Sequence, residues 1–311
     1  MRSNVTTDLP LVSIAIPAYN HARYLGEAIR SVLEQDYPHI ELIVLDDGST
    51  DDTREVLARH TGKFFWETQE NMGQARTLNK AWRLAKGDIL GYLGADDILL
   101  PRAVGRCVNC LQTHRNAIVA YCDFNLIDRD SRIVRRVRAP DFDFLDMVAK
   151  LACPPGPGAF FRRPADDEFW WNPDFRQMPD YDFWLRMGLR GPFVRIPETL
   201  AGFRVHESSA TFSRADSRRA GEPIAILTSF FQSALPPHIS ALRPRALSNA
   251  HLVSAQLHWR AGRFRPGLAC LVDGARLYWP NLLTANMLRL LFNALFNRLG
   301  HRLLRALRPR N

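Results

Sequence analysis

The sequence of 311 residues lacks any long apolar run. Hydrophobic residues make up 46% of the chain, yet no stretch of about 18 uncharged apolar residues occurs, so we predict no transmembrane helix. The first ten residues lack an apolar segment, and the run Leu11–Pro17 is short and ends in proline, which predicts no signal peptide. With only 23% charged residues, wholesale disorder is excluded. We therefore expect a folded, cytoplasmic protein.

Cysteine is scarce, and its number is odd. An odd set in a chain of this length gives no disulfide framework, which favours a reducing compartment. Cys107 and Cys110 form a C-x-x-C pair in a predicted helix, Pro101–Gln112, but no second pair completes four zinc ligands. We expect both to pack against apolar neighbours, with a metal or redox site as the alternative. The five cysteines are Cys107, Cys110, Cys122, Cys153 and Cys270.

Acidic residues are nearly absent from the C-terminal part. Residues 1–100 carry 10 basic and 15 acidic side chains, residues 101–216 carry 17 and 15, and residues 217–311 carry 14 and 2. The net charge of +9 therefore comes from the last third of the chain. This asymmetry favours contact of that part with a polyanion or a membrane over a surface that coats nucleic acid.

The first hundred residues alternate between apolar runs and amphipathic segments. Apolar runs predict strands, and apolar residues at helical spacing predict helices. Such alternation is typical of an α/β domain with a mostly parallel, Rossmann-like sheet flanked by helices. The predicted strands are 11–17, 40–45, 64–66 and 88–93, and the predicted helices are 24–35, 52–59 and 73–86. Farther on, 117–128 and 133–137 predict antiparallel strands, and 181–188 predicts a helix.

Two acidic pairs follow predicted strands. Asp46 and Asp47 come after the strand 40–45, and Asp96 and Asp97 come just past the strand 88–93. Parallel sheets bind ligands beyond the carboxyl ends of their strands. Adjacent carboxylates repel each other, and a divalent cation between them and a diphosphate would relieve that cost. The alternative for the first pair is capping of the helix that follows.

Four short motifs occur in a fixed order. They are Pro17-Ala-Tyr-Asn20, Leu45-Asp-Asp-Gly-Ser-Thr-Asp51, Asn71-Met-Gly73 and Gly94-Ala-Asp-Asp97. In order and spacing they resemble the family 2 glycosyltransferases, which have a GT-A fold. Two later segments also fit: Met178–Arg186 is similar to the acidic motif of that family, and Phe203–Ser208 is similar to its terminal Tyr-Arg-x-His segment. The resemblance covers residues 10–212.

The resemblance implies a nucleotide-sugar site at the ends of the predicted strands. Tyr19 and Asp47 would contact the base of the nucleotide. Pro17 and Asn20 belong to the same motif as Tyr19, and Gly73 closes the third motif, so we assign all three to the nucleotide sugar as well. The donor implied first is a UDP-sugar, and the acceptor implied is a saccharide or a lipid-linked saccharide.

The resemblance also implies the residues that carry the chemistry. Asp96 would face the ribose or the diphosphate, and Asp97 would hold a Mn²⁺ or Mg²⁺ ion. His206 would help to hold the metal or the diphosphate, with Arg204 beside it. Asp180 would be the general base that deprotonates the acceptor hydroxyl.

The sequence departs from the pattern of the family in two places. The family often has a first aspartate two positions before the final one, where this chain has Ala95, preceded by Gly94. The glutamate that usually precedes the base is Pro179 here. Asp182 is a rival for the base, although the first turn of a helix is an ordinary place for a carboxylate.

The chemistry of sugar transfer needs these residue types. A nucleotide sugar loses a diphosphate, and a divalent cation neutralises the charge that develops on it. The acceptor hydroxyl needs a carboxylate within hydrogen-bond reach. One base and no additional nucleophile give a single displacement that inverts the anomeric carbon, so we predict an inverting glycosyltransferase.

The domain organisation follows from these patterns. We predict a GT-A catalytic domain over residues 1–215, with a nucleotide-sugar half over about 10–100 and an acceptor half over about 101–215, and a basic helical region over 216–311. Apolar residues recur at helical spacing over 292–307, and 281–311 holds six arginines and no acid. This pattern favours a peripheral contact of 282–308 with an anionic membrane at the cytoplasmic face. Packing of that helix on the catalytic domain is the alternative.

Three other functions stay open. A nucleotidyltransferase could also use carboxylates and a metal, but it would need a glycine-rich basic phosphate loop after the first strand, and Ala18–Ala22 is not one. A nucleic-acid-binding protein would use the basic tail, and its binding would depend strongly on salt. A non-catalytic glycosyltransferase-like protein is the third alternative, because Pro179 departs from the motif.

Overall fold

The computed structural model describes residues 9–165, 170–206 and 215–283. It divides into two compact units, of which the first holds residues 1–144 and 153–212 and the second holds 145–152 and 213–311. The predicted amphipathic helix over 292–307 lies outside the described residues. The domain boundary that the sequence predicts between residues 215 and 216 stays a prediction.

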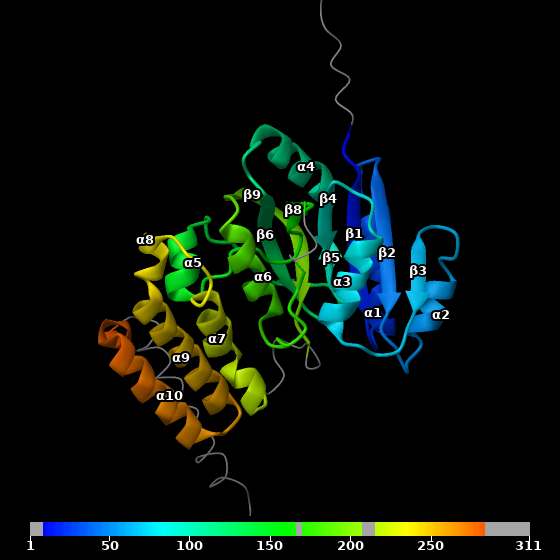
Figure 1. The fold of residues 1–311 in the computed structure, drawn as a ribbon. Coiled ribbons are helices and arrows are strands. Elements are labelled where there is room, and N and C mark those ends of the chain that lie inside the picture. Colours follow the sequence, from blue (N-terminus) through cyan, green and yellow to red (C-terminus); the bar gives the residue numbers. More distant parts are fainter. Residues whose placement is uncertain (1–8, 166–169, 207–214, 284–311) are drawn as a thin grey trace, which may run out of the picture. The chain divides into compact units, whose positions relative to one another are not determined.

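A nine-stranded mixed sheet forms the centre of the first unit. Strands β1 to β4 pair in parallel and lie side by side in Figure 1, whereas β8 runs antiparallel to its two neighbours. Across the sheet the order is β3 (Phe65–Thr68), β2 (Ile40–Asp46), β1 (Val12–Ala18), β4 (Ile89–Tyr92), β8 (Phe160–Arg162), β6 (Val119–Ile127), β9 (Phe193–Arg204) and β5 (Ile98–Leu99), and β7 (Ile133–Val137) pairs with β6. The predicted α/β fold with a mostly parallel sheet is confirmed.

Helices connect the strands of the first unit. They are α1 (Ala22–Leu33), α2 (Thr53–Ala58), α3 (Gln74–Leu84), α4 (Ala103–Thr113) and α6 (Pro179–Gly188). Helix α1 has the amphipathic pattern that the sequence predicts, and it buries Leu25, Ala28, Ile29 and Val32 in the core. Each large apolar side chain buried in this way contributes about 1.5–3 kcal/mol. Strand β1 is buried along its whole length.

The chain changes direction across the sheet at β1. Strand β2 lies on one side of β1 and β4 lies on the other. Ligands of such sheets bind at this switch point, beyond the carboxyl ends of the strands. Pro17 lies in β1 past the last residue that pairs with β4, because that register ends at Ala15 and Tyr92. The missing N–H of Pro17 therefore costs no bond to β4.

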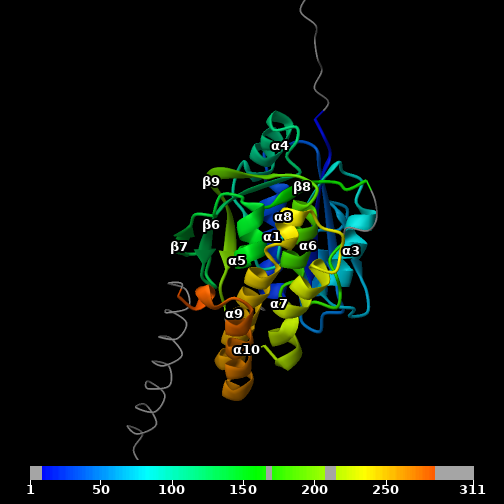
Figure 2. The same cartoon turned by 60° about the vertical axis from the view of Figure 1, so that its left-hand side comes forward.

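The second unit is helical. Its elements are α5 (Phe144–Lys150), α7 (Ser217–Phe230), α8 (Pro237–Ser240), α9 (Arg243–Arg260), α10 (Phe264–Leu277) and the 3₁₀ helix η1 (Trp279–Leu283). Helices α9 and α10 lie side by side in both views (Figure 2). Over the ranges that the structure describes, no helix is long and apolar enough to cross a membrane.

Candidate functional site

The carboxyl ends of β1, β2 and β4 bring most of the predicted site residues together. Tyr19 follows β1 and is 47% exposed, which leaves its ring available to a ligand. Asp47 follows β2, and its backbone N–H donates to the carbonyl of Ala18 over 2.8 Å. Asp96 and Asp97 follow β4. These three strand ends form one continuous edge, as the sequence predicts for a parallel sheet.

Asn20 joins the first two strand ends. Its side-chain Oδ1 accepts a hydrogen bond from the N–H of Thr50 over 2.8 Å, and its own N–H donates to Ser49 Oγ over 2.9 Å. Asn20 also has a φ of 55°, a left-handed conformation that asparagine tolerates better than most residues. The contacts of Asn20 therefore hold the turn at residues 49–51 beside Tyr19.

Asp47 holds the loop that leads into α3. It is only 3% exposed, and its Oδ1 accepts from Gln69 Nε2 over 3.0 Å and from the N–H of Met72 over 2.9 Å. Its Oδ2 accepts from the N–H of Gly73 over 2.9 Å. Gly73 has a φ of 86°, which a residue with a side chain adopts only under strain. Three donors on one carboxylate make Asp47 an organiser of this loop.

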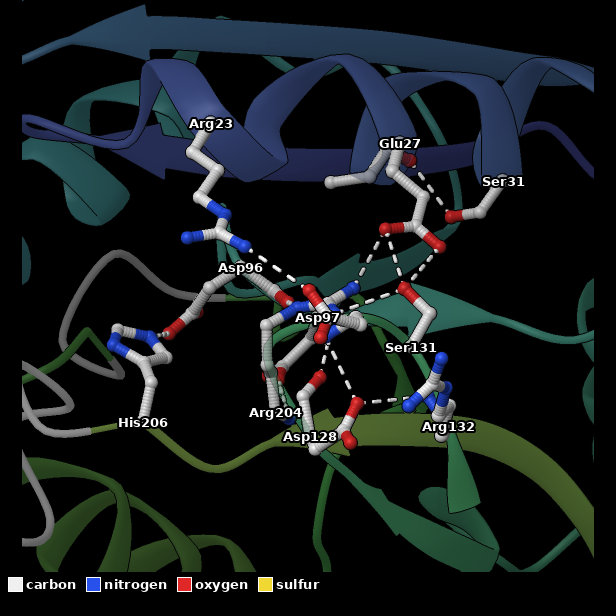
Figure 3. A network of polar contacts seen from close by, with 12 residues as sticks. Arg23, Glu27, Ser31, Asp96, Asp97, Asp128, Ser131, Arg132, Arg204 and His206 are labelled. Carbon is white, nitrogen blue, oxygen red and sulfur yellow. Dashed lines mark hydrogen bonds and ion pairs between the residues drawn. The ribbon is translucent and has the colours of Figure 1, made fainter.

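The two carboxylates after β4 have different surroundings. Asp97 is 7% exposed, and its Oδ1 accepts from the backbone N–H of Arg204 over 2.8 Å. Asp96 is more accessible, and its Oδ2 lies 2.9 Å from His206 Nε2 (Figure 3). The same oxygen lies 3.9 Å from His21 Nε2. The structure thus brings His206 to Asp96 and attaches Asp97 to the backbone of β9.

The pKa of Asp97 reflects this burial. Burial is the main cause that raises its pKa well above the ordinary value of 3.8, and the neighbouring charge of Asp96 raises it further. The hydrogen bond from Arg204 offsets part of this effect.

Gly94 allows both carboxylates to lie close to its Cα, because a Cβ there would lie 2.7 Å from Asp97 Oδ2 and 2.9 Å from Asp96 Oδ1. A glycine at this position therefore leaves space beside both carboxylates.

Arg204 lies at the acidic pair but is fully buried. Its Nε donates to the backbone carbonyl of Asp96 over 2.7 Å, and its Nη2 pairs with Glu27 Oε2 over 2.7 Å. A side chain with no exposed surface does not reach a bound ligand. We therefore interpret Arg204 as a residue that holds Asp96 and Asp97, and its predicted contact with the nucleotide stays a prediction.

Asp180 lies in the first turn of α6, where Pro179 occupies a position that suits proline. Burial raises the pKa of Asp180, and backbone hydrogen bonds from Tyr181 and from its own N–H offset part of that rise. Its rival Asp182 is engaged in an ion pair with Arg186 at 2.8 Å. This ion pair favours a structural role for Asp182.

Tyr92 at the end of β4 links Asp180 to the acidic pair. Burial raises the pKa of the Tyr92 hydroxyl well above 10.0, and the charges of Asp180, Cys153 and Asp97 raise it further. Both Asp180 and Asp97 are thus near enough to act on the same hydroxyl. The predicted base and the predicted metal site consequently belong to one region of the first unit.

The model of the family described as glycosyl transferase family 2 matches residues 13–170. The chain belongs to glycosyl transferase family 2. It is 28% identical over 215 residues to a chondroitin synthase of Escherichia coli, a match that covers 68% of this chain and 31% of the relative. It is 32% identical over 216 residues to the uncharacterized glycosyltransferase RT0329 of Rickettsia typhi, covering 65% and 66%. The chain thus spans less than two thirds of the length of these relatives.

Solved structures share the GT-A fold with this family 2 chain. Residues 1–349 of Staphylococcus aureus TarS, in complex with UDP-GlcNAc, superpose with a TM-score of 0.63 at 17% identity, covering 86% of this chain and 89% of that one. The mannosyltransferase PcManGT from Pyrobaculum calidifontis, in complex with GDP-Man and Mn²⁺, gives 0.58 at 21% identity, covering 94% and 88%. At these identities the likeness shows the fold.

The sequence alone did not point to three residues of this family 2 site. His21 directly follows the Pro17–Asn20 motif, so its position was a usable signal. Tyr92 closes an apolar strand with a polar tip five residues before Asp97, which is a weaker signal. Glu27 lies on α1, and only the fold brings it to Arg204.

The surroundings of Asp97 give a test of its role. A carboxyl whose pKa is raised in the folded state stabilises the fold below its unfolded pKa of about 3.8, and this stabilisation is lost as pH rises through the folded pKa. Asp97→Asn removes the charge and keeps an oxygen for Arg204. At pH 7 we expect the melting temperature to rise by about 2–4 °C, the change that about 1 kcal/mol causes in a domain of this size.

Melting curves of wild type and Asp97→Asn between pH 4 and pH 8 measure this effect. We expect the difference to shrink towards pH 4, because the carboxyl is then protonated in the folded state and about half protonated in the unfolded state. A melting temperature that falls in Asp97→Asn at pH 7 would show that the ionised carboxylate is needed for stability.

Proposed function

We propose that the protein is an inverting, metal-dependent glycosyltransferase that transfers the sugar of a nucleoside diphosphate sugar to an acceptor hydroxyl. The observation that carries this proposal is the grouping of Asp96 with His206, and of Asp180 near Tyr92, at one edge of the sheet. This grouping supplies a site for a charged leaving group and a separate buried carboxylate for the acceptor. Membership of glycosyl transferase family 2 supports it.

The donor we propose is a UDP-sugar. Tyr19 is exposed beside β1, where its ring can stack on a nucleotide base, and Asp47 holds the loop at residues 69–73 that would border the base. The TarS structure contains UDP-GlcNAc, whereas the PcManGT structure contains GDP-Man. GDP-sugars are therefore the comparison set in a donor screen. The acceptor we propose is a saccharide or a lipid-linked saccharide.

The residues after β4 fit a divalent cation. A carboxylate with an imidazole is a donor set that Mn²⁺ accepts, and Gly94 leaves space beside the carboxylates. In the described part of the chain, no three His, Cys, Asp or Glu side chains are placed to hold a metal. A pair of protein ligands suits an ion that takes its other ligands from a diphosphate and water. Such an ion would neutralise the charge of the departing diphosphate.

We assign the metal to Asp96 and His206. The sequence favours Asp97, but Oδ1 of Asp97 accepts the backbone N–H of Arg204 and the residue is only 7% exposed. Asp96 is the more accessible of the two and already faces an imidazole.

Asp180 is the general base of this proposal. Its carboxylate would accept the proton of the acceptor hydroxyl while the oxygen of that hydroxyl attacks the anomeric carbon. The bond from the anomeric carbon to the diphosphate breaks on the opposite face, so the configuration inverts. The raised pKa of Asp180 brings its basicity closer to neutral pH, which strengthens a general base.

The role of Asp180 can be tested by its pH dependence. The base acts only when ionised, so we expect kcat/KM to fall at acid pH through a pKa above the ordinary value of 3.8. Asp180→Asn should lower kcat by about 10²–10⁴-fold, the usual contribution of general-base catalysis. Transfer of sugar from UDP-sugars, followed across pH with Mn²⁺ present, measures both.

Asp182→Asn is the matched control for this experiment. It makes the same substitution in the same turn but changes only the ion pair with Arg186. We expect it to keep most of the activity. If Asp180→Asn retained wild-type kcat, or if Asp182→Asn lost activity instead, the assignment of the base would be wrong.

The metal assignment predicts which carboxylate binds Mn²⁺ together with a nucleotide. We expect Asp96→Asn to weaken Mn²⁺-dependent binding of UDP at least about tenfold, since even residues behind the ligands change metal affinity by that factor. Asp97→Asn should leave the dissociation constant nearly unchanged. Titration calorimetry of UDP with and without Mn²⁺ distinguishes the two assignments. Weaker binding in Asp97→Asn than in Asp96→Asn would assign the metal to Asp97.

A peripheral contact with an anionic membrane is the proposed partner of the C-terminal part. Seven of the seventeen exposed large apolar side chains in the described residues lie within 264–283, which spans α10 and η1, and they include Trp279 at 64% and Leu283 at 71% exposure. Arg265 is exposed on the same helix, as is Arg276, which pairs with Asp273 over 3.5 Å. Residues 284–311 add six arginines and no acid. Exposed aromatics beside basic residues suit an anionic lipid surface.

Vesicle binding tests this partner. We expect the full chain to sediment with phosphatidylglycerol vesicles, less so as salt rises, and to ignore phosphatidylcholine vesicles. Truncation after Asn281 should weaken binding strongly, because it removes Leu283 and the six arginines that follow. A truncated chain that binds equally well would rule out a contribution of residues 282–311, and binding that ignores lipid charge would end the membrane proposal while leaving the transfer reaction untouched.

A further inference from the structure

The guanidinium of Arg204 is enclosed by groups from three parts of the first unit (Figure 3). Glu27 on α1 accepts from Nη2 over 2.7 Å. The turn between β6 and β7 supplies the carbonyl of Asp128 and the hydroxyl of Ser131, each 2.9 Å from Nη1. The ring of Tyr24 lies 4.7 Å from the guanidinium carbon. We call Glu27, Ser131 and the Asp128 carbonyl the Arg204 clamp.

Ser131 bridges the two charged members of this cluster. Its Oγ lies 2.7 Å and 2.9 Å from the two carboxylate oxygens of Glu27, so the hydroxyl donates to Glu27 while it accepts from Arg204 Nη1. A charge as deeply buried as that of Arg204 needs a paired acid, and Glu27 supplies it. The clamp therefore fixes both the charge and the direction of the guanidinium.

The backbone conformation of Ser131 supports a role for its side chain. Its φ is 64°, in the left-handed region where a residue with a Cβ is strained and glycine is not. The carboxylate of Asp128 enforces this turn by accepting from the N–H groups of Asp130 and Arg132, over 2.8 and 2.9 Å. A serine in a conformation that suits glycine indicates that the side chain does something that glycine cannot.

Two further donors of Arg204 reach the acidic pair. Nε donates to the carbonyl of Asp96 over 2.7 Å, and the backbone N–H donates to Asp97 Oδ1 over 2.8 Å. The direction of the guanidinium thus sets the position of the Asp96 backbone, and with it the carboxylate that faces His206. A shift of Arg204 would move Asp96 although nothing at the site itself had changed.

We propose that Ser131 and Glu27 are positioning residues for the donor site: they lock Arg204, and Arg204 holds Asp96 and Asp97 in the arrangement that receives the nucleotide diphosphate and its metal. The proposal rests on the proposed function for what Asp96 receives. The mechanical part, that the clamp holds the loop after β4, stands without it.

Ser131→Gly tests the clamp, because it removes the hydroxyl and relieves the strained φ, so the variant should fold. Asp130→Gly is the matched control. It alters the same turn and removes a contact with the same helix, the 3.1 Å ion pair to Arg23, without touching Arg204. The full-length protein is used in each case.

The first measurement is hydrogen exchange of the ligand-free protein. We expect Ser131→Gly to speed exchange of the amides at 94–100 and 203–206 about fivefold or more, since local opening there costs less without the clamp. Exchange in β1 and β2 should stay as in wild type, and Asp130→Gly should match wild type throughout. Unchanged exchange at 94–100, or an equal change in both variants, would overturn the proposal.

The second measurement is calorimetric binding of UDP and of GDP, each with Mn²⁺. We expect Ser131→Gly to weaken binding about tenfold, the lower end of what residues behind a metal ligand contribute. Glu27→Gln should weaken it too, and the double variant should lose little more than the worse single variant, because the two act through one guanidinium. Wild-type affinity in Ser131→Gly, or additive losses in the double variant, would contradict the clamp.

The two measurements separate the two hypotheses. If the wild type binds neither nucleotide, the proposed function fails, while exchange at 94–100 still decides whether the clamp holds the loop. If the wild type binds and Ser131→Gly binds equally, with unchanged exchange, the clamp fails and the proposed function stands.

Discussion

The site depends on keeping two adjacent carboxylates at the end of a buried strand. Asp97 is buried and Asp96 is beside it, so each ionised group raises the cost of the other. Arg204 meets this cost from inside the protein, through its backbone N–H and its guanidinium, and is itself neutralised by Glu27. A solvated loop would hold the same acidic pair at a lower electrostatic free energy, but it would not fix the positions of the two carboxylates.

The parallel strands explain why this costly pair lies where a ligand can use it. Strands β1, β2 and β4 end at one edge, because β1 lies between its two parallel neighbours. Each strand end is then tied to the next by a side chain: Asn20 holds the turn after β2, and Asp47 holds the loop before α3. The residues that the family motifs single out are therefore of two kinds. Tyr19 and Asp96 present side chains that a ligand can reach, whereas Asn20, which is also exposed, and the buried Asp47 build the edge on which they lie.

The sequence predicts the sheet and the region of the site well, because both depend on local patterns. Apolar runs and motif spacing suffice to place Asp96 after a strand. The role of each residue within the site depends on contacts between residues that are far apart in the sequence. Whether Asp96 or Asp97 faces His206 depends on which carboxylate the backbone of β9 engages. Ser131 contacts Glu27 from 104 residues away, and no periodicity of the sequence carries that information.

Tyr92 is influenced by both the proposed base and the acidic pair. The charges of Asp180 and Asp97 both raise the pKa of the Tyr92 hydroxyl. A cation that neutralises Asp96 and Asp97 would therefore lower that pKa. Burial is the main cause that raises the pKa of Asp180, and backbone hydrogen bonds offset part of the rise. The pKa of Asp180 is therefore governed chiefly by the packing of α6. If Asp180 is the base, as we propose, its raised pKa would depend on the fold of the first unit and not on a nucleotide bound at the acidic pair.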